Sequence, residues 1–137
     1  MAGRNVAETL RSQLVPTFGS LVSRARLHSG PVARALAGSL GADAFVLGRR
    51  VFLSARAAEA IEQGARESLA LLAHELTHVA QYRRLGLPTF LARYVREYLR
   101  LRWAGRDHDG AYREITFERE AMAAERELRP GDPVAAG

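Results

Sequence analysis

The 137-residue sequence contains no cysteine and no lysine, which narrows the chemistry available to it. Without cysteine there are no disulfides and no thiolate ligands, so any zinc site must use nitrogen and oxygen atoms. All 20 basic residues are arginine and the net charge is +5. Arginine binds phosphate well, but we interpret this composition as the codon bias of a GC-rich genome, because net charge alone says little about function.

Long hydrophobic runs are also missing. No apolar stretch approaches the roughly 20 residues that a membrane-spanning helix needs. Residues 1–10 have no apolar segment behind a basic flank, so we predict no secretory signal. We therefore expect a cytoplasmic protein, unless a dedicated secretion or injection system exports it.

The length and the ordinary globular composition, 47% hydrophobic and 26% charged, favour one domain over residues 1–137. Within it we expect an N-terminal helical segment at residues 1–24 and a frayed tail at residues 129–137.

The first half of the chain alternates short apolar runs with turn-forming residues, which predicts short strands and helices. The expected elements are a helix at Asn5–Leu14 broken by Pro16 and Gly19, a strand at Arg26–His28, a helix at Pro31–Leu40 closed by Gly41, and a hairpin of Ala44–Leu47 and Arg50–Leu53. Val32, Leu36 and Leu40 share one face of the second helix. Ser54–Gly64 is expected to be a loop with one helical turn.

The second half shows helical periodicity throughout. We predict helices at Arg66–Leu85, Thr89–Ala104 and Ala111–Leu128, with a turn at Gly105–Gly110. A small sheet followed by long helices is an α+β arrangement.

The chemistry centres on His74-Glu75-Leu76-Thr77-His78, in the middle of the first of these long helices. Residues four apart lie on the same face of a helix, so two imidazoles can bind one zinc ion. Glu75 lies at the edge of that face, where a carboxylate can take a proton from water that zinc has acidified. We therefore predict His74 and His78 as zinc ligands and Glu75 as the catalytic base. The alternative is a pair of surface histidines with a solvated glutamate between them.

A catalytic zinc usually has three protein ligands. His108 is the only downstream histidine and lies in a charged turn, so the better candidates are Glu118 and Glu120 in the last helix. These two residues are about 200° apart around a helix, so only one of them can face the ion. The pattern itself hardly separates them, and either could instead be a solvated charge paired with an arginine.

At this point a family resemblance is evident. Leu71–Gln81 resembles the active-site helix of the zinc metallopeptidase domain associated with extracellular contractile injection systems, and Ala25–Pro31 and Gly41–Gly48 resemble the upstream segments of that domain. The resemblance covers roughly residues 26–81. It implies a minimal zincin-like domain and a contractile injection machinery as a partner.

More broadly, the chain resembles the gluzincin peptidases, whose third zinc ligand is a glutamate followed three residues later by a small residue. Glu118 with Ala121 matches that spacing and favours Glu118, although Glu120 with Ala123 matches it too. The family often has an acidic residue four positions after the ligand, where this chain has Met122. The partner that orients a zinc-binding histidine must then be a backbone carbonyl or another side chain.

Three further features bear on the predicted site. In zincins an edge strand pairs with the substrate peptide; by resemblance this strand is Val51–Leu53, with an internal strand as the equal alternative. Tyr112 could donate a hydrogen bond to the oxyanion of the transition state, but we favour a plain core or surface tyrosine. His28 could belong to the site, although a strand-end histidine satisfied by the backbone is the simpler interpretation.

These patterns predict a zinc-dependent metalloendopeptidase that acts on a peptide or protein substrate. The alternative is a zinc-stabilised, non-hydrolytic effector or docking module of a contractile injection or toxin-type system, although such a module would not need Glu75. A third hypothesis is a basic surface for anionic lipid or nucleic acid, formed by Arg93, Arg96 and Arg100 beside three aromatic residues. We favour a solvated helix face for these arginines and expect no nucleic-acid partner.

Overall fold

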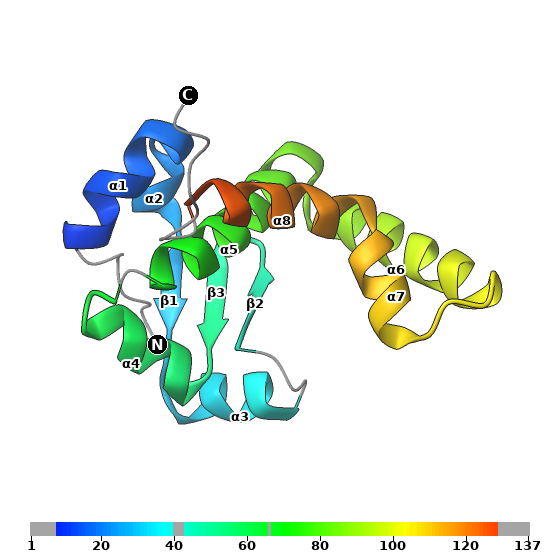
Figure 1. Ribbon diagram of the computed structural model, residues 1–137, viewed down its shortest axis with the longest axis horizontal. Helices are drawn as coiled ribbons and strands as arrows, with labels where there is room; N and C mark the ends of the chain where they lie inside the picture. The colour runs from blue at the N-terminus through cyan, green and yellow to red at the C-terminus, as the bar shows by residue number, and fades with distance from the viewer. Residues whose placement is uncertain (1–7, 40–42, 66, 129–137) are drawn as a thin grey trace.

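The computed structural model describes residues 8–39, 43–65 and 67–128. The elements are, in chain order, α1 (Glu8–Phe18), α2 (Leu21–Arg24), β1 (Arg26–His28), α3 (Pro31–Ser39), β2 (Ala44–Leu47), β3 (Arg50–Leu53), α4 (Ala55–Glu62), α5 (Glu67–Leu85), α6 (Leu87–Trp103), α7 (His108–Glu114) and α8 (Thr116–Leu128). The predicted α+β class, a small N-terminal sheet followed by long helices, is confirmed (Figure 1).

The three strands are ordered β1-β3-β2, so β3 is the central strand. It pairs parallel with β1 and antiparallel with β2, and Gly48 has the positive φ that the tight turn between β2 and β3 requires. The predicted hairpin is therefore confirmed. Of the two alternatives for Val51–Leu53, the internal strand is confirmed and the edge strand is wrong, because β3 pairs with β1 on one side and with β2 on the other.

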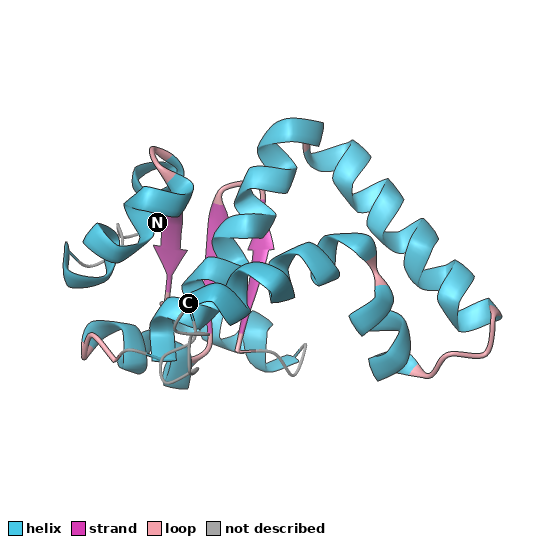
Figure 2. Cartoon of the chain, turned by 45° about the horizontal axis from the view of Figure 1, so that its top comes forward, coloured by secondary structure: helices cyan, strands magenta, loops and turns pink. Residues whose placement is uncertain are grey.

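Helix α5 packs most extensively against α8 and also contacts β2 and α6. Leu72 and Leu76 of α5 are almost completely buried, together with Val51 and Leu53 of the central strand. Gly86, with φ 83°, follows the end of α5, and Pro88 lies in the first turn of α6, which runs in a new direction. Figures 1 and 2 show α6 leaving the end of α5 and extending away from the sheet, with α7 near its far end.

Two predictions for the first half of the chain were wrong about helix ends. Helix α1 runs through Pro16, because Leu10 and Leu14 are buried in the core and Gly19 closes the last turn by donating to the Val15 carbonyl at 2.7 Å. The segment after β3 is a helix rather than a loop. The Ser54 side chain accepts a hydrogen bond from the Ala57 amide at 3.1 Å, which caps the start of α4.

Two further findings concern the buried face of one helix and a break in another. Val32 is 69% exposed, and α3 instead buries Ala33 and Ala37, which allow a closer approach to the sheet. The last predicted helix is two helices, because Ile115 adopts an extended conformation between α7 and α8 and is completely buried. Thr116 then anchors the start of α8 through hydrogen bonds to Glu97 of α6.

The predictions for residues 1–7, for Leu40 and Gly41, for Arg66 and for the tail at 129–137 lie outside the described residues. Among the helices of the described ranges, none combines the length and apolarity needed to cross a bilayer.

Candidate metal centre

The two histidines lie one turn apart on the buried side of α5. His74 and His78 are each 7% exposed, and their ring centroids are 5.0 Å apart at an interplanar angle of 73°. Glu75, between them in sequence, is 5% exposed. The alternative of two surface histidines around a solvated glutamate therefore does not describe this structure.

The third group comes from α8. Glu118 is buried, and its Oε1 atom lies 2.9 Å from His74 Nε2 and 3.1 Å from His78 Nε2. One ligand atom from each of His74, His78 and Glu118 can be chosen such that all lie within 4.8 Å of one another. Glu120 is exposed and points elsewhere, accepting a hydrogen bond from Gln81 Nε2 at 2.9 Å. The structure thus brings Glu118, and not Glu120, to the imidazoles.

The other nitrogen of each imidazole also has a partner. His74 Nδ1 lies 2.9 Å from Glu125 Oε1, and His78 Nδ1 lies 2.8 Å from Gln81 Oε1. Gln81 is buried and donates from its amide to the Phe117 carbonyl at 3.0 Å, which fixes which of its atoms faces His78. With Nδ1 donating to these oxygens, each histidine presents Nε2 as the ligand atom.

The sequence patterns did not identify Glu125 or Gln81 as partners of the histidines. The family pattern has an acidic residue four positions after the ligand, where this chain has Met122. Glu125 instead lies seven positions after Glu118, two turns along the same face of α8. Gln81 lies three positions after His78, a spacing that places it on the same side of α5. Both spacings were visible in the sequence as helical neighbours of the predicted ligands.

Two tyrosines interact with the Glu118 carboxylate. Tyr94 of α6 donates its hydroxyl proton to Glu118 Oε2 at 2.7 Å. Burial, the charge of Glu118 and a hydrogen bond with Glu118 all raise the pKa of Tyr94, and the same three effects raise the pKa of Tyr112. Both phenols therefore remain protonated donors at neutral pH. Tyr112, the candidate oxyanion donor, therefore lies beside the cluster, and Tyr94 is a second phenol in contact with Glu118.

Burial and the interactions within the cluster shift the pKa values of His74, His78 and Glu118 in opposite directions. Burial lowers the pKa of His74, but the hydrogen bond to Glu118 and the charges of Glu75 and Glu118 outweigh this and raise it to about 9. The pKa of His78 is also raised, for the same reasons. Burial alone would raise the pKa of Glu118, but the hydrogen bonds from both histidines lower it. A divalent cation competes with these protons, because the ligands must be neutral imidazoles and a carboxylate.

These residues fit a zinc ion. Two imidazole nitrogens and one glutamate oxygen form a known ligand set of catalytic zinc, which keeps its fourth position open. Tetrahedral zinc with bonds of about 2.1 Å separates its ligand atoms by about 3.4 Å. The observed separations between Glu118 Oε1 and the two Nε2 atoms, 2.9 and 3.1 Å, are somewhat shorter than this.

The remaining histidines do not belong to this cluster. His28 of β1 stacks on Phe52, with ring centroids 5.1 Å apart, and its Nε2 atom lies 3.3 Å from a guanidinium nitrogen of Arg50. His108 is exposed at the start of α7, and its Nδ1 atom lies 3.0 Å from the Tyr98 hydroxyl.

A family model described as the eCIS core domain matches residues 5–86, more than half of the chain. The chain belongs to the eCIS core domain family. This membership associates it with extracellular contractile injection systems. No curated protein and no solved structure shows detectable similarity to the chain.

The match includes His74, Glu75 and His78 of this eCIS core domain protein but ends at Gly86. Glu118 and Glu125 therefore come from the part of the chain beyond the match, and α8 adds them to the cluster.

Proposed function

We propose that this eCIS core domain protein is a zinc-dependent metallopeptidase that hydrolyses peptide bonds in a peptide or protein substrate. The observation that carries the proposal is the convergence of His74, His78 and Glu118 in a buried cluster that also contains Glu75. A purely structural zinc site would have four protein ligands and would not need a glutamate of this kind. The described residues instead offer three ligands, which leaves one position for substrate and water.

Bound zinc supplies a Lewis acid that polarises the scissile carbonyl and lowers the pKa of the attacking water. Glu75 acts as the general base. Burial raises the pKa of Glu75, although the charges of His78 and His74 oppose this. A base of raised pKa can take the proton from the water and then deliver it to the leaving amine.

The other residues hold this machinery in place. Glu125 and Gln81 orient the two imidazoles, and Tyr94 orients the Glu118 carboxylate.

By the zincin resemblance, an edge strand would pair with an extended substrate. That role would belong to β2, which is the edge strand in contact with α5. Tyr82 already donates to the Val46 carbonyl of this strand at 3.0 Å, so the peptide would pair with its other backbone groups.

The test is Glu75→Gln, measured with a casein-type substrate and by metal analysis of the purified protein. Zinc content should stay at one ion per chain, while cleavage should fall by at least about 10³-fold because the base is lost. Glu67→Gln is the matched control, since Glu67 is an exposed glutamate of the same helix. Equal cleavage by Glu75→Gln and the parent protein would refute the mechanism.

The second candidate is a metal-stabilised docking module of the injection machinery that does not hydrolyse peptides. Family membership favours it, since the family is associated with these systems. Full zinc occupancy with no turnover on any peptide library would support this alternative and would contradict the peptidase proposal.

A further inference from the structure

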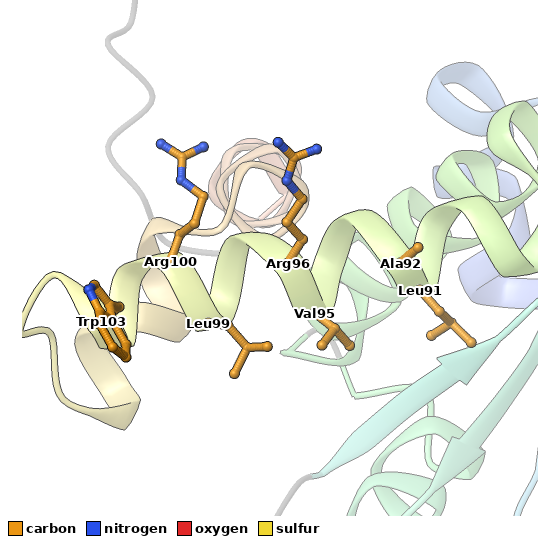
Figure 3. A pocket seen from close by; sticks show the side chains of 7 residues that line it. All are labelled: Leu91, Ala92, Val95, Arg96, Leu99, Arg100 and Trp103. Atoms are coloured by element: carbon orange, nitrogen blue, oxygen red, sulfur yellow. The ribbon is translucent and has the colours of Figure 1, made fainter.

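Helix α6 exposes an apolar stripe that the metal centre does not use. Its members recur every fourth residue and are all solvent-exposed: Leu91 at 36%, Val95 at 50%, Leu99 at 58% and Trp103 at 94%. Residues four apart are offset by about 40° around a helix, so these side chains form one slowly winding row. Figure 3 shows Leu91, Val95 and Leu99 projecting to the same side of the helix.

A row of arginines lies beside this stripe. Arg96 and Arg100 line the same surface along one flank of the stripe, and their side chains point away from those of Leu91, Val95 and Leu99 (Figure 3). Within the described part of the chain, neither forms an ion pair with a carboxylate. The acidic residue of α6, Glu97, is engaged by the amide and hydroxyl of Thr116 at 2.9 and 2.8 Å. The outer surface of α6 is therefore apolar and positively charged.

The face of α6 that carries Phe90 and Tyr94 packs against the rest of the protein. Phe90 is buried against Tyr82 and Phe117, and Tyr94 donates to Glu118. Together with the Thr116 contacts to Glu97, these interactions set the orientation of the helix. The apolar stripe is consequently presented outward, on a helix that extends away from the sheet (Figures 1 and 2).

We propose that the outer face of α6 binds the surface of an anionic phospholipid bilayer, with the apolar stripe inserted among the acyl chains and the arginines on the headgroups. An interfacial helix combines modest overall hydrophobicity with leucine and tryptophan on one side and basic residues on the other, as α6 does. Arginine can also extend its charged end to the phosphates while its stem lies along the apolar surface.

Charge complementarity selects this occupant. A second copy of the chain would place arginines against arginines, and a single row of four side chains is small compared with the roughly 800 Å² per partner of a stable protein interface. Anionic headgroups instead supply the opposite charge along the whole face. Each arginine near an anionic membrane surface increases the binding affinity about fivefold.

Trp103 makes the proposal directly measurable. It is the single tryptophan of the chain and lies at the end of the stripe, 94% exposed. Adding vesicles that contain phosphatidylglycerol should shift its fluorescence to shorter wavelength, and brominated acyl chains should quench it. Phosphatidylcholine vesicles should give neither effect, and added salt should weaken the binding to anionic vesicles.

The apolar contribution is tested by Val95→Ser, with Val32→Ser as the matched control. Both valines are exposed on helices, at 50% and 69%, but only Val95 belongs to the stripe. Val95→Ser should weaken binding to anionic vesicles about tenfold, because the apolar contact is lost. Val32→Ser should leave binding within about twofold of the parent protein.

The charge contribution is tested by the double variant Arg96→Gln with Arg100→Gln. Binding should fall about 30-fold, as expected for two arginines at an anionic surface. The control is Arg83→Gln with Arg84→Gln, an exposed arginine pair in the last turn of α5, which should have less than a third of that effect.

The proposal is overturned if anionic vesicles do not shift the Trp103 fluorescence, or if phosphatidylcholine vesicles bind equally well. It is also overturned if the test and control variants lose equal binding affinity for anionic vesicles. A fourth contradicting result is Trp103 fluorescence that is blue-shifted without lipid and reverts on dilution. The last would assign the stripe to an interface between copies of the chain. Glu75→Gln should bind vesicles as the parent does, which keeps this test separate from the proposed peptidase activity.

Discussion

Removal of the Glu125 carboxylate should weaken zinc binding although Glu125 is not one of the three proposed ligands. Its Oε1 atom lies 2.9 Å from His74 Nδ1, so Glu125→Ala leaves that nitrogen without its acceptor. The imidazole can then rotate and exchange tautomers, and fewer of its conformations present Nε2 to the ion.

The size of the effect follows from the burial of the pair. The His74 side chain is 10% exposed and that of Glu125 is 26% exposed, so water screens the contact only partly. A hydrogen bond to a charged group is worth about 1.5–3 kcal/mol, and the exposure of Glu125 favours the lower end. That energy corresponds to a loss of about 10- to 30-fold in zinc affinity, within the range measured when such outer partners are removed.

The assay is a competition titration with a chromogenic chelator at fixed pH, together with thermal unfolding of each variant. Glu125→Gln keeps an acceptor oxygen at this position and should retain most of the affinity. Glu127→Ala removes an exposed carboxylate two residues along the same helix and should bind zinc as the parent does. If Glu125→Ala binds zinc as tightly as Glu127→Ala, Glu125 does not orient His74 and the argument fails.

Three further predictions concern the ligand set and the fold. Glu118→Ala should lose stoichiometric zinc in metal analysis while Glu120→Ala retains it; the reverse result would move the third ligand to Glu120. A strong chelator should lower the melting temperature, and zinc in about thousandfold excess over its Kd should restore about 4 kcal/mol of stability; an unchanged melting temperature would contradict specific binding to the folded state. Leu72→Ala should cost about 3 kcal/mol in urea unfolding, because Leu72 is completely buried, and a loss below about 1 kcal/mol would contradict its place in the core.

Much of the fold and of the site follows from local patterns. The spacing of His74 and His78 determined that both imidazoles lie on one face of α5, because a helix repeats about every four residues. The hairpin of β2 and β3 was also predictable, since two apolar runs separated by Gly48-Arg49 define both strands and their turn. Each of these features depends on residues that are near one another in the chain.

Other features depend on which faces meet in three dimensions. Helical periodicity places Glu118 and Glu120 on different sides of α8 but does not specify which side faces α5. Only the packing of α8 on α5 places Glu118 at the imidazoles. Similarly, the break at Ile115 accompanies the complete burial of that side chain in the core, and no turn-forming residue marks it in the sequence. Burial overrides local preference where enough apolar surface is removed from water.

The sequence by itself determined the helix that carries the two histidines and Glu75, because hydrogen bonding within one helix sets their relative positions. Tertiary structure alone decided that β3 is central, that Glu125 and Gln81 orient the imidazoles, and that the stripe on α6 faces outward. These outcomes depend on contacts between segments far apart in the chain, and the pattern within one segment does not specify its partner.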